Sequence, residues 1–164
     1  MSPVLSHSIT ISIAQQTLSL YSNTLLIKVY AVSSGLQGVG CEKNSGKTPL
    51  GNHIIRAKIG TDEPLNSVFV GRRPTGEIYT KNLANLHPNR DWILSRILWL
   101  SGAEIGRNRL GQVDTMQRYI YIHGTPDTEP MGIALSHGCI RMRNKDVLEL
   151  FDLVEPFTPV EIVE

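Results

Sequence analysis

Apolar and polar residues alternate over much of the first sixty positions of this 164-residue chain, a pattern typical of half-buried β-strands. Three isoleucines share one face of a first strand: Ile9, Ile11 and Ile13. Leu18 and Leu20 resume the alternation after the polar residues 14–16. Two alternating segments joined by a short polar stretch predict a β-hairpin.

Further strands are predicted along the chain. The run LLIKVYAVSSG from Leu25 is long enough for a central strand, and in residues 51–59 His53 shares the inward face of Ile55. Short strands are expected at 67–71 and 76–80. The apolar spacing of residues 91–102 fits a strand and a short helix equally well, so both remain open for that segment.

The segment RYIYIH alternates again and carries a histidine. Tyr119, Tyr121 and His123 fall on one face, and Ile120 and Ile122 fall on the other. Successive side chains of a strand point to opposite sides. We therefore expect His123 at the end of a strand, on its less apolar side.

One helix is predicted, near the C-terminus. Four apolar residues follow a helical spacing: Val147, Leu150, Phe151 and Val154. Asn144 stands where an N-cap is expected, Asp146 suits the first turn, and Pro156 would end the helix. Residues 159–164 read as a last strand. Many strands and one clear helix predict a mostly β, β-rich α+β fold, in a single domain over residues 1–164.

Charge and composition exclude some partners. Sixteen basic and fifteen acidic residues are nearly balanced, and no basic stripe suits a phosphate backbone, so we expect no nucleic-acid partner. No segment approaches the roughly 20 apolar residues that span a bilayer. The start of the chain has no basic n-region and no unbroken apolar h-region. We expect a cytoplasmic protein, the alternative being a periplasmic or cell-wall protein whose leader was removed.

The densest cluster of reactive side chains is HGTPDTEPMGIALSHGCIRMRN, residues 123–144. A cysteine nucleophile needs a base and backbone N–H donors aimed at the oxyanion that forms on attack. His123 can serve Cys139 if the segment between them loops out and back, and Gly138 lets the backbone approach a substrate closely. The following helix would favour a thiolate if its N-terminus points toward Cys139.

Three motifs carry a resemblance to a known family. HGT at 123–125, SHGCIRM at 136–142 and KTPLG at 47–51 resemble the L,D-transpeptidase catalytic domain family (YkuD-like). The resemblance implies a β-sandwich catalytic domain without a cofactor. It also implies that Cys139 is the nucleophile and His123 the general base and acid.

The resemblance assigns roles to the residues around this pair. The carbonyl of Gly124 would orient the imidazole, and His137, Gly138 and Cys139 would line the oxyanion hole. Substrate contacts are expected from three further residues: Ser136, which would also brace the loop, Tyr121 and Arg141. Many members of the family have Asn where this chain has Arg141, whose guanidinium would pair with a substrate carboxylate.

The implied substrate is a peptidoglycan stem peptide or muropeptide. Cys139 would attack an L-centre linked to D-alanine, release the D-alanine and hold the acyl group as a thioester. We favour a cytoplasmic L,D-carboxypeptidase that trims tetrapeptides during murein recycling. An exported L,D-transpeptidase that forms cross-links is the first alternative, and a non-catalytic wall-binding module is the second.

The same residues also allow two other interpretations, a metal site and a disulfide. A zinc site would need His123, His137 and Cys139 together with Cys41, but no CxxC or HxxxH pair supports one. We therefore expect no metal. A Cys41 to Cys139 disulfide would silence the nucleophile. The sequence makes no prediction of the oligomeric state.

Overall fold

The structure is a computed structural model that describes residues 6–164. It contains ten strands, which are β1 His7–Ser12, β2 Thr17–Ser22, β3 Leu25–Ser33, β4 Gly51–Ile59, β5 Ser67–Val70, β6 Arg73–Ile78, β7 Ile93–Gly102, β8 Tyr121–Thr125, β9 Ile140–Arg143 and β10 Pro159–Val163. The helices are α1 Lys81–Leu86, α2 Asn144–Leu153 and a 3₁₀ turn at Gly111–Val113. The predicted mostly β fold with one main helix is confirmed.

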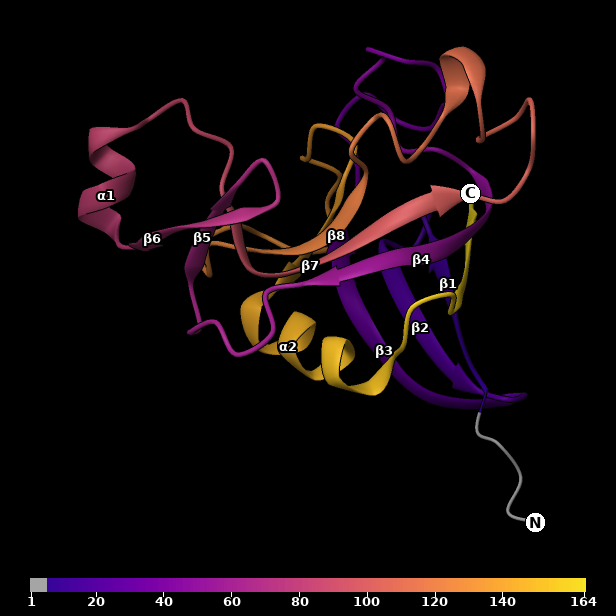
Figure 1. Ribbon diagram of the computed structural model, residues 1–164, viewed down its shortest axis with the longest axis horizontal. Coiled ribbons are helices and arrows are strands. Elements are labelled where there is room, and N and C mark those ends of the chain that lie inside the picture. The colour runs from indigo at the N-terminus through magenta and orange to yellow at the C-terminus, as the bar shows by residue number, and fades with distance from the viewer. Residues whose placement is uncertain (1–5) are drawn as a thin grey trace.

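All ten strands belong to one sheet that closes on itself. Their order is β4-β10-β1-β2-β3-β9-β8-β7-β5-β6, and an additional pairing joins β4 to β7. That pairing makes a closed ring of the first eight strands in the order. The strands β5 and β6 extend from β7 and lie beside α1, away from the hairpin of β1 and β2 (Figure 1).

The predicted first hairpin is confirmed, and its inward face builds the core. Ile9 pairs with Leu20 and Ile11 with Leu18 in the antiparallel register. All four side chains are buried in the main apolar cluster of the molecule. Burying an aliphatic side chain of this size contributes about 1.5–3 kcal/mol, so the alternation seen in the sequence is also a main source of stability.

The undecided segment 91–102 is a strand. It forms β7, which lies between β8 on one side and β4 and β5 on the other. The register with β8 shifts between Leu94 and Ile97, where Ser95 adopts a φ of 72°. An extra residue in a strand breaks its period-2 alternation, which explains why the spacing also suited a helix.

Strand β8 is shorter at its start than predicted. It begins at Tyr121, because Tyr119 has a φ of 57° and its amide donates to the carbonyl of Met116 in a turn. His123 therefore lies in the middle of β8 and not at the end of a strand as expected. This central position buries the imidazole, which is 1 % exposed.

Helix α2 has its predicted apolar face, but its start differs. Asn144 is the first helical residue and not the N-cap; Arg143 occupies that position without a side-chain cap. The side chain of Asn144 is instead buried and bonded to other elements. Asp146 lies in the first turn as expected, and Val147 and Leu150 are fully buried.

The short helix α1 was not predicted. It has a side-chain N-cap, because Thr80 Oγ1 accepts from the amide of Leu83, but it contains no buried residue. A six-residue helix without an apolar face leaves no periodic signal in the sequence. Across residues 6–164, neither this helix nor any other is long and apolar enough to cross a membrane.

Candidate active site

The register of β8 and β9 decides which side chains meet. The two strands run parallel, with Ile122 opposite Ile140 and His123 opposite Arg141. Both isoleucines are buried in the core. Because side chains alternate across a strand, His123 and Arg141 face the other way, out of the main core.

Cys139 lies on this same outer face, directly before β9. Its Sγ accepts a hydrogen bond from the amide of Tyr121 at 3.3 Å, which places the thiol beside the first residue of β8. His123 is two residues further along β8, and alternate residues of a strand point to the same side. The structure thus places the predicted nucleophile and the predicted base on one face of one strand pair.

The imidazole of His123 is held by a backbone carbonyl. Its Nδ1 lies 2.6 Å from the oxygen of Gly124, so this nitrogen must carry the proton and donate it to the carbonyl. Nε2 is then the nitrogen with a free lone pair. Burial lowers the pKa of His123 below the usual range, so the ring is neutral at pH 7.

Position 124 has room only for a glycine. A Cβ atom there would collide with Oδ1 of Asn144 and with the carbonyl oxygen of Leu94. Gly124 therefore allows β8 to pack closely against β7 and the start of α2. That close packing in turn fixes the carbonyl that orients His123.

The resting cysteine is a thiol. Burial raises the pKa of Cys139 to about 12, and the charge of Asp91 acts in the same direction. The amide of Tyr121 and the guanidinium groups of Arg141 and Arg118 oppose this shift without cancelling it. The resting thiol donates to the carbonyl of Tyr119 at 3.4 Å. The thiol and the imidazole of His123 thus both begin neutral, and deprotonation of the thiol requires a base.

The helix expected to favour a thiolate lies elsewhere. Helix α2 starts after β9, whereas Cys139 precedes β9. Four residues of strand span about 13 Å, and a helix dipole acts mainly within its own first turn. The N-terminus of α2 therefore does not activate Cys139.

Ser136 braces the turn that carries the cysteine. Its Oγ accepts from the amide of Gly138 at 3.1 Å and donates to the carbonyl of Cys139. Gly138 has a φ of 123°, which favours glycine. Ser136 is 2 % exposed, so its position fits the bracing role and not the substrate contact that was also expected of it.

Thr48, to which no role was assigned from the sequence, holds the same turn from the loop between β3 and β4. Its hydroxyl donates to the carbonyl of Gly138 at 2.9 Å and accepts from the amide of Gly35 at 2.8 Å. Thr48 belongs to the KTPLG motif. The motif marked Thr48 as part of a family signature, but only the structure shows that Thr48 anchors the cysteine turn.

The donors for an oxyanion are restricted. The amide of Gly138 is taken by Ser136, whereas the structure records no partner within residues 6–164 for the amides of His137 and Cys139. The side chain of His137 is largely exposed, with Nδ1 3.4 Å from a carboxylate oxygen of Asp91. Of the three predicted contributors, His137 and Cys139 thus retain available N–H groups.

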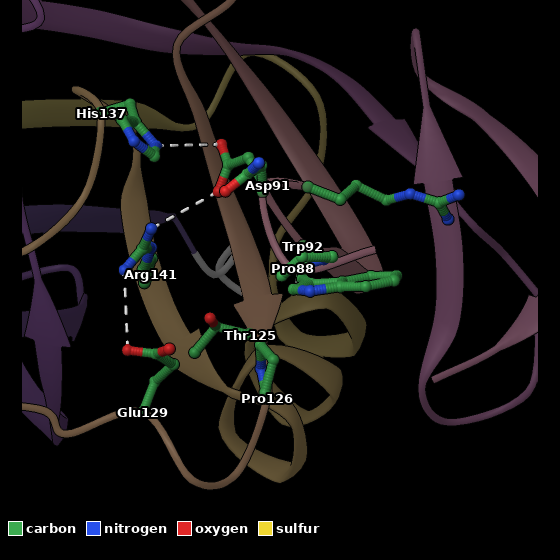
Figure 2. A pocket seen from close by; sticks show the side chains of 10 residues that line it. Pro88, Asp91, Trp92, Thr125, Pro126, Glu129, His137 and Arg141 are labelled. Carbon is green, nitrogen blue, oxygen red and sulfur yellow. Dashed lines mark hydrogen bonds and ion pairs between the residues drawn. The ribbon is translucent and has the colours of Figure 1, made fainter. Parts of the chain in front are cut away.

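Arg141 has partners that the sequence did not reveal. Its guanidinium lies 3.4 Å from Asp91 and 3.9 Å from Glu129, and the side chain is only 11 % exposed. Figure 2 shows Asp91 between His137 and Arg141, with Glu129 on the far side of the guanidinium. Arg141 is therefore already paired with two carboxylates, and its expected contact with a substrate carboxylate stays a prediction.

These side chains line a pocket of about 270 Å³ next to the cysteine turn. Its other walls come from the segment before β7 and the end of β8, including Trp92 and Pro126 (Figure 2). Asp91 and Glu129 were not predicted as site residues. Asp91 lies 50 positions and Glu129 12 positions before Arg141. No periodic pattern links residues at such separations, so the sequence does not indicate these contacts.

Cys139 itself opens into a second and larger pocket of about 520 Å³. Tyr121, predicted as a substrate contact, lines this pocket together with Gly71, Arg72, Asp91, Ile93, Arg118, Tyr119, Ile120, His137 and Cys139. Asp91 and His137 belong to both pockets. A molecule bound to the thiol would therefore extend between the turn after β5 and the cysteine loop.

Arg118 joins the glycine-rich loop after β3 to this site. Its guanidinium donates to the carbonyls of Gly40 and Lys47, and to the hydroxyl of Ser45. The charge lies close enough to Cys139 to lower its pKa slightly. Arg118 thus combines a structural contact with a positive charge beside the thiol.

Asn144, which was expected to be the N-cap of α2, is instead a buried residue beside the site. Its Nδ2 donates to the carbonyl of Thr125 at 2.8 Å, and its Oδ1 accepts from Ser95 Oγ at 2.7 Å. It thereby ties β8 to the bulge of β7 beside Gly124. Its sequence signal was the expected N-cap position, which does not reveal these contacts.

The rival interpretations of the cysteines can be compared with the structure. Cys41 and Cys139 are both free thiols, and Sγ of Cys41 lies 3.8 Å from the carbonyl of Leu50. Within the described residues 6–164, no group of three or more His, Cys, Asp and Glu side chains is arranged to hold a metal ion. Neither cysteine is therefore cross-linked, and Cys139 shares the outer face of the β8–β9 pair with His123.

Comparisons with known proteins identify the family of the chain. The family model described as the L,D-transpeptidase catalytic domain, YkuD, matches residues 6–162. A Bacillus subtilis protein named as an L,D-transpeptidase, YkuD, is 30% identical over 156 residues, and its Bacillus licheniformis counterpart is 29% identical. Each alignment covers 95% of this chain and 65% of the relative, so the chain spans about two thirds of those proteins.

Solved structures show the same fold. An L,D-transpeptidase from Mycobacterium smegmatis superposes with a TM-score of 0.62 at 17% identity, over 98% of this chain and 59% of that one. The L,D-transpeptidase LdtMt1 in complex with imipenem gives 0.58 at 18% identity, over 97% and 59%. With the family match over nearly its whole length, the chain belongs to the L,D-transpeptidase catalytic domain family.

Proposed function

We propose that this protein is a cysteine-dependent acyl-transfer enzyme that acts on peptidoglycan stem peptides. The observation that carries the proposal is the placement of Cys139 and His123 on the outer face of β8 and β9. Family membership supplies the substrate class. The bond cleaved joins an L-centre to D-alanine, as the family resemblance implies.

The neutral resting state suggests how the first step proceeds. Nε2 of His123 removes the proton from Sγ of Cys139 as the sulfur attacks the carbonyl carbon of the substrate. The amides of His137 and Cys139 would stabilise the oxyanion. The resulting imidazolium would return its proton to the departing amine of D-alanine, leaving a thioester on Cys139.

The acceptor for the thioester is the finer part of the proposal, and we favour water. The segment between β8 and Ser136 is fastened to β3: Gly132 N donates to Val32 O, and Leu135 N donates to Ser33 Oγ. A segment tied down in this way offers little material for a lid that would shield the thioester from water. Hydrolysis makes the protein an L,D-carboxypeptidase, and transfer to an amine makes it an L,D-transpeptidase.

We also propose that the protein works in the cytoplasm, where trimming of tetrapeptides would serve murein recycling. Its two cysteines, Cys41 and Cys139, are unpaired, which suits a reducing compartment. Fractionation of cells that make the native gene product tests this location. Recovery in the periplasm or the wall would favour the exported L,D-transpeptidase instead.

The activity is tested by mixing the protein with a stem tetrapeptide and an excess of an amine acceptor, and identifying the products by mass. We expect tripeptide and free D-alanine. The variant Cys139→Ala serves as the control and should give neither product. A predominance of cross-linked peptide would replace the carboxypeptidase with a transpeptidase, and binding without turnover would favour the non-catalytic wall-binding module.

A further inference from the structure

The turn between β5 and β6 places an arginine over the pocket of Cys139. The turn residues Gly71 and Arg72 have φ values of 57° and 63°, and the flanking Val70 and Arg73 are paired. Positive φ at both central residues is typical of a tight type I′ hairpin turn. Arg72 is therefore carried on a short and well-defined turn, and not on a long loop.

The guanidinium of Arg72 is positioned by three aromatic side chains. Its Nη1 donates to the hydroxyl of Tyr121 at 3.0 Å. Its Cζ lies 4.6 Å from the ring centre of Tyr119 and 4.8 Å from that of Trp99. Such contacts restrict a long side chain that would otherwise sample many rotamers, so its charge is held in place.

The guanidinium of Arg72 has N–H donors that are free to bind a ligand. Arginine has five N–H donors, and one nitrogen of Arg72 contacts Tyr121. Among residues 6–164, no carboxylate forms an ion pair with Arg72. Arg141, by contrast, is paired with Asp91 and Glu129. Arg72 is thus the better placed of the two to receive a new carboxylate.

The pocket around it carries an excess of positive charge. Of the residues that line the 520 Å³ pocket, Arg72 and Arg118 are cationic and Asp91 is anionic. Both Nη atoms of Arg118 already donate hydrogen bonds to carbonyls and a hydroxyl of the loop after β3. Arg118 therefore adds charge to the pocket, whereas Arg72 offers both charge and free donors.

We propose that Arg72 binds a carboxylate of the acyl donor and makes this site selective for acidic peptides. The inference rests on the proposed function, because it assigns a specificity residue to the same pocket. It replaces Arg141, which the sequence suggested for this role. An arginine can hold a carboxylate through two parallel hydrogen bonds, so Arg72 would fix the donor as well as attract it.

The test compares a stem tetrapeptide with derivatives in which each carboxylate in turn is converted to an amide. For the unaltered protein, we expect one amidated derivative to lose about tenfold or more in kcat/KM, mainly through a higher KM. The variant Arg72→Gln should show a similar loss with the unmodified peptide and should no longer distinguish it from that derivative. Arg73→Gln is the matched control: it removes the same charge from the adjacent exposed position and should behave like the unaltered protein.

The outcomes separate this inference from the proposed function. If the protein releases D-alanine but Arg72→Gln keeps the full preference, the role of Arg72 is refuted and the enzyme activity stands. If no peptide is turned over, the role of Arg72 is tested by calorimetry, which measures how tightly the Cys139→Ser protein binds the same peptides. Weaker binding of one amidated peptide, abolished by Arg72→Gln, would support the site without the chemistry; equal binding of all peptides would refute it.

Discussion

The protonation states of His123 and Cys139 are set by their surroundings in the fold. The motif identified both residues, but their protonation depends on burial, which raises the pKa of the thiol to about 12 and lowers that of the imidazole. A preformed thiolate would need the opposite environment. These directions support the proposed mechanism, in which His123 acts as general base on the thiol at the moment of attack.

Removal of either member of this pair should abolish or severely reduce D-alanine release. Cys139→Ala leaves no nucleophile, and His123→Ala should lower kcat by about a hundredfold or more, as loss of a general base does. Steady-state release of D-alanine measures both effects, with Cys41→Ala as the control that should keep full activity. Only a mild loss in His123→Ala would show that His137 is the base.

At the scale of elements, the site depends on contacts between two strands, β7 and β8, and the helix α2. Gly124 lets β8 approach β7 and the start of α2, and Asn144 bonds to the carbonyl of the next residue, Thr125. Ser95, at the bulge of β7, completes the link. The carbonyl that orients His123 is therefore held in place partly by Asn144 and Ser95, neither of which lines the pocket of Cys139.

Replacement of Asn144 should weaken both the fold and the catalytic geometry. Asn144→Leu keeps the approximate volume but leaves the Thr125 carbonyl and the Ser95 hydroxyl without a partner, at a cost of about 1–3 kcal/mol in the free energy of unfolding. Because Asn144 acts through β8, we expect kcat to fall with little change in KM, and the acid limb of the pH–rate profile to shift. Urea unfolding and steady-state kinetics provide the two measurements.

The control for this prediction lies one residue further along the helix. Lys145 is exposed, so Lys145→Ala should leave stability and kinetics close to those of the unaltered protein. If Asn144→Leu loses stability while its kcat and pH–rate profile stay unchanged, Asn144 is structural only. A proportional change in KM would point to the substrate pocket instead.

For the whole molecule, a buried histidine far from Cys139 in the sequence makes stability depend on pH. His53, expected on the inward face of residues 51–59, is 1 % exposed, and its two ring nitrogens contact the carbonyl of Gly51 and the hydroxyl of Thr115. Burial lowers its pKa from 6.5 to about 4. The unfolded chain thus binds a proton at a pH where the folded protein does not.

Acidification should therefore destabilise the protein. The contribution of His53 is fully present above pH 6.5 and is lost as the pH falls toward about 4; a shift of this size corresponds to on the order of 3 kcal/mol. His123, whose pKa is also lowered, acts in the same direction. Chemical unfolding between pH 4 and 7.5 measures the slope, and His53→Gln should flatten part of it. An unchanged slope in that variant would contradict the assignment to His53.

The sequence by itself determined the local elements of this protein. The alternation of Ile9, Ile11, Leu18 and Leu20 predicted the first hairpin, and the helical spacing after residue 144 predicted α2. Such patterns are readable because each element must turn one face to the core, and its own residues record that face. The chemical motifs likewise named the thiol, the imidazole and the glycine beside it.

The tertiary structure alone decided how these pieces meet. The parallel register of β8 and β9 sets His123 and Cys139 on one face, and packing brings Asp91 and Glu129 to Arg141 and Arg72 to Tyr121. Periodicity describes how one segment faces the core, but it carries no information about which distant side chain a charged group will meet. For that reason the sequence supplied the reacting groups, whereas their protonation and the residue free to bind a substrate carboxylate followed from the fold.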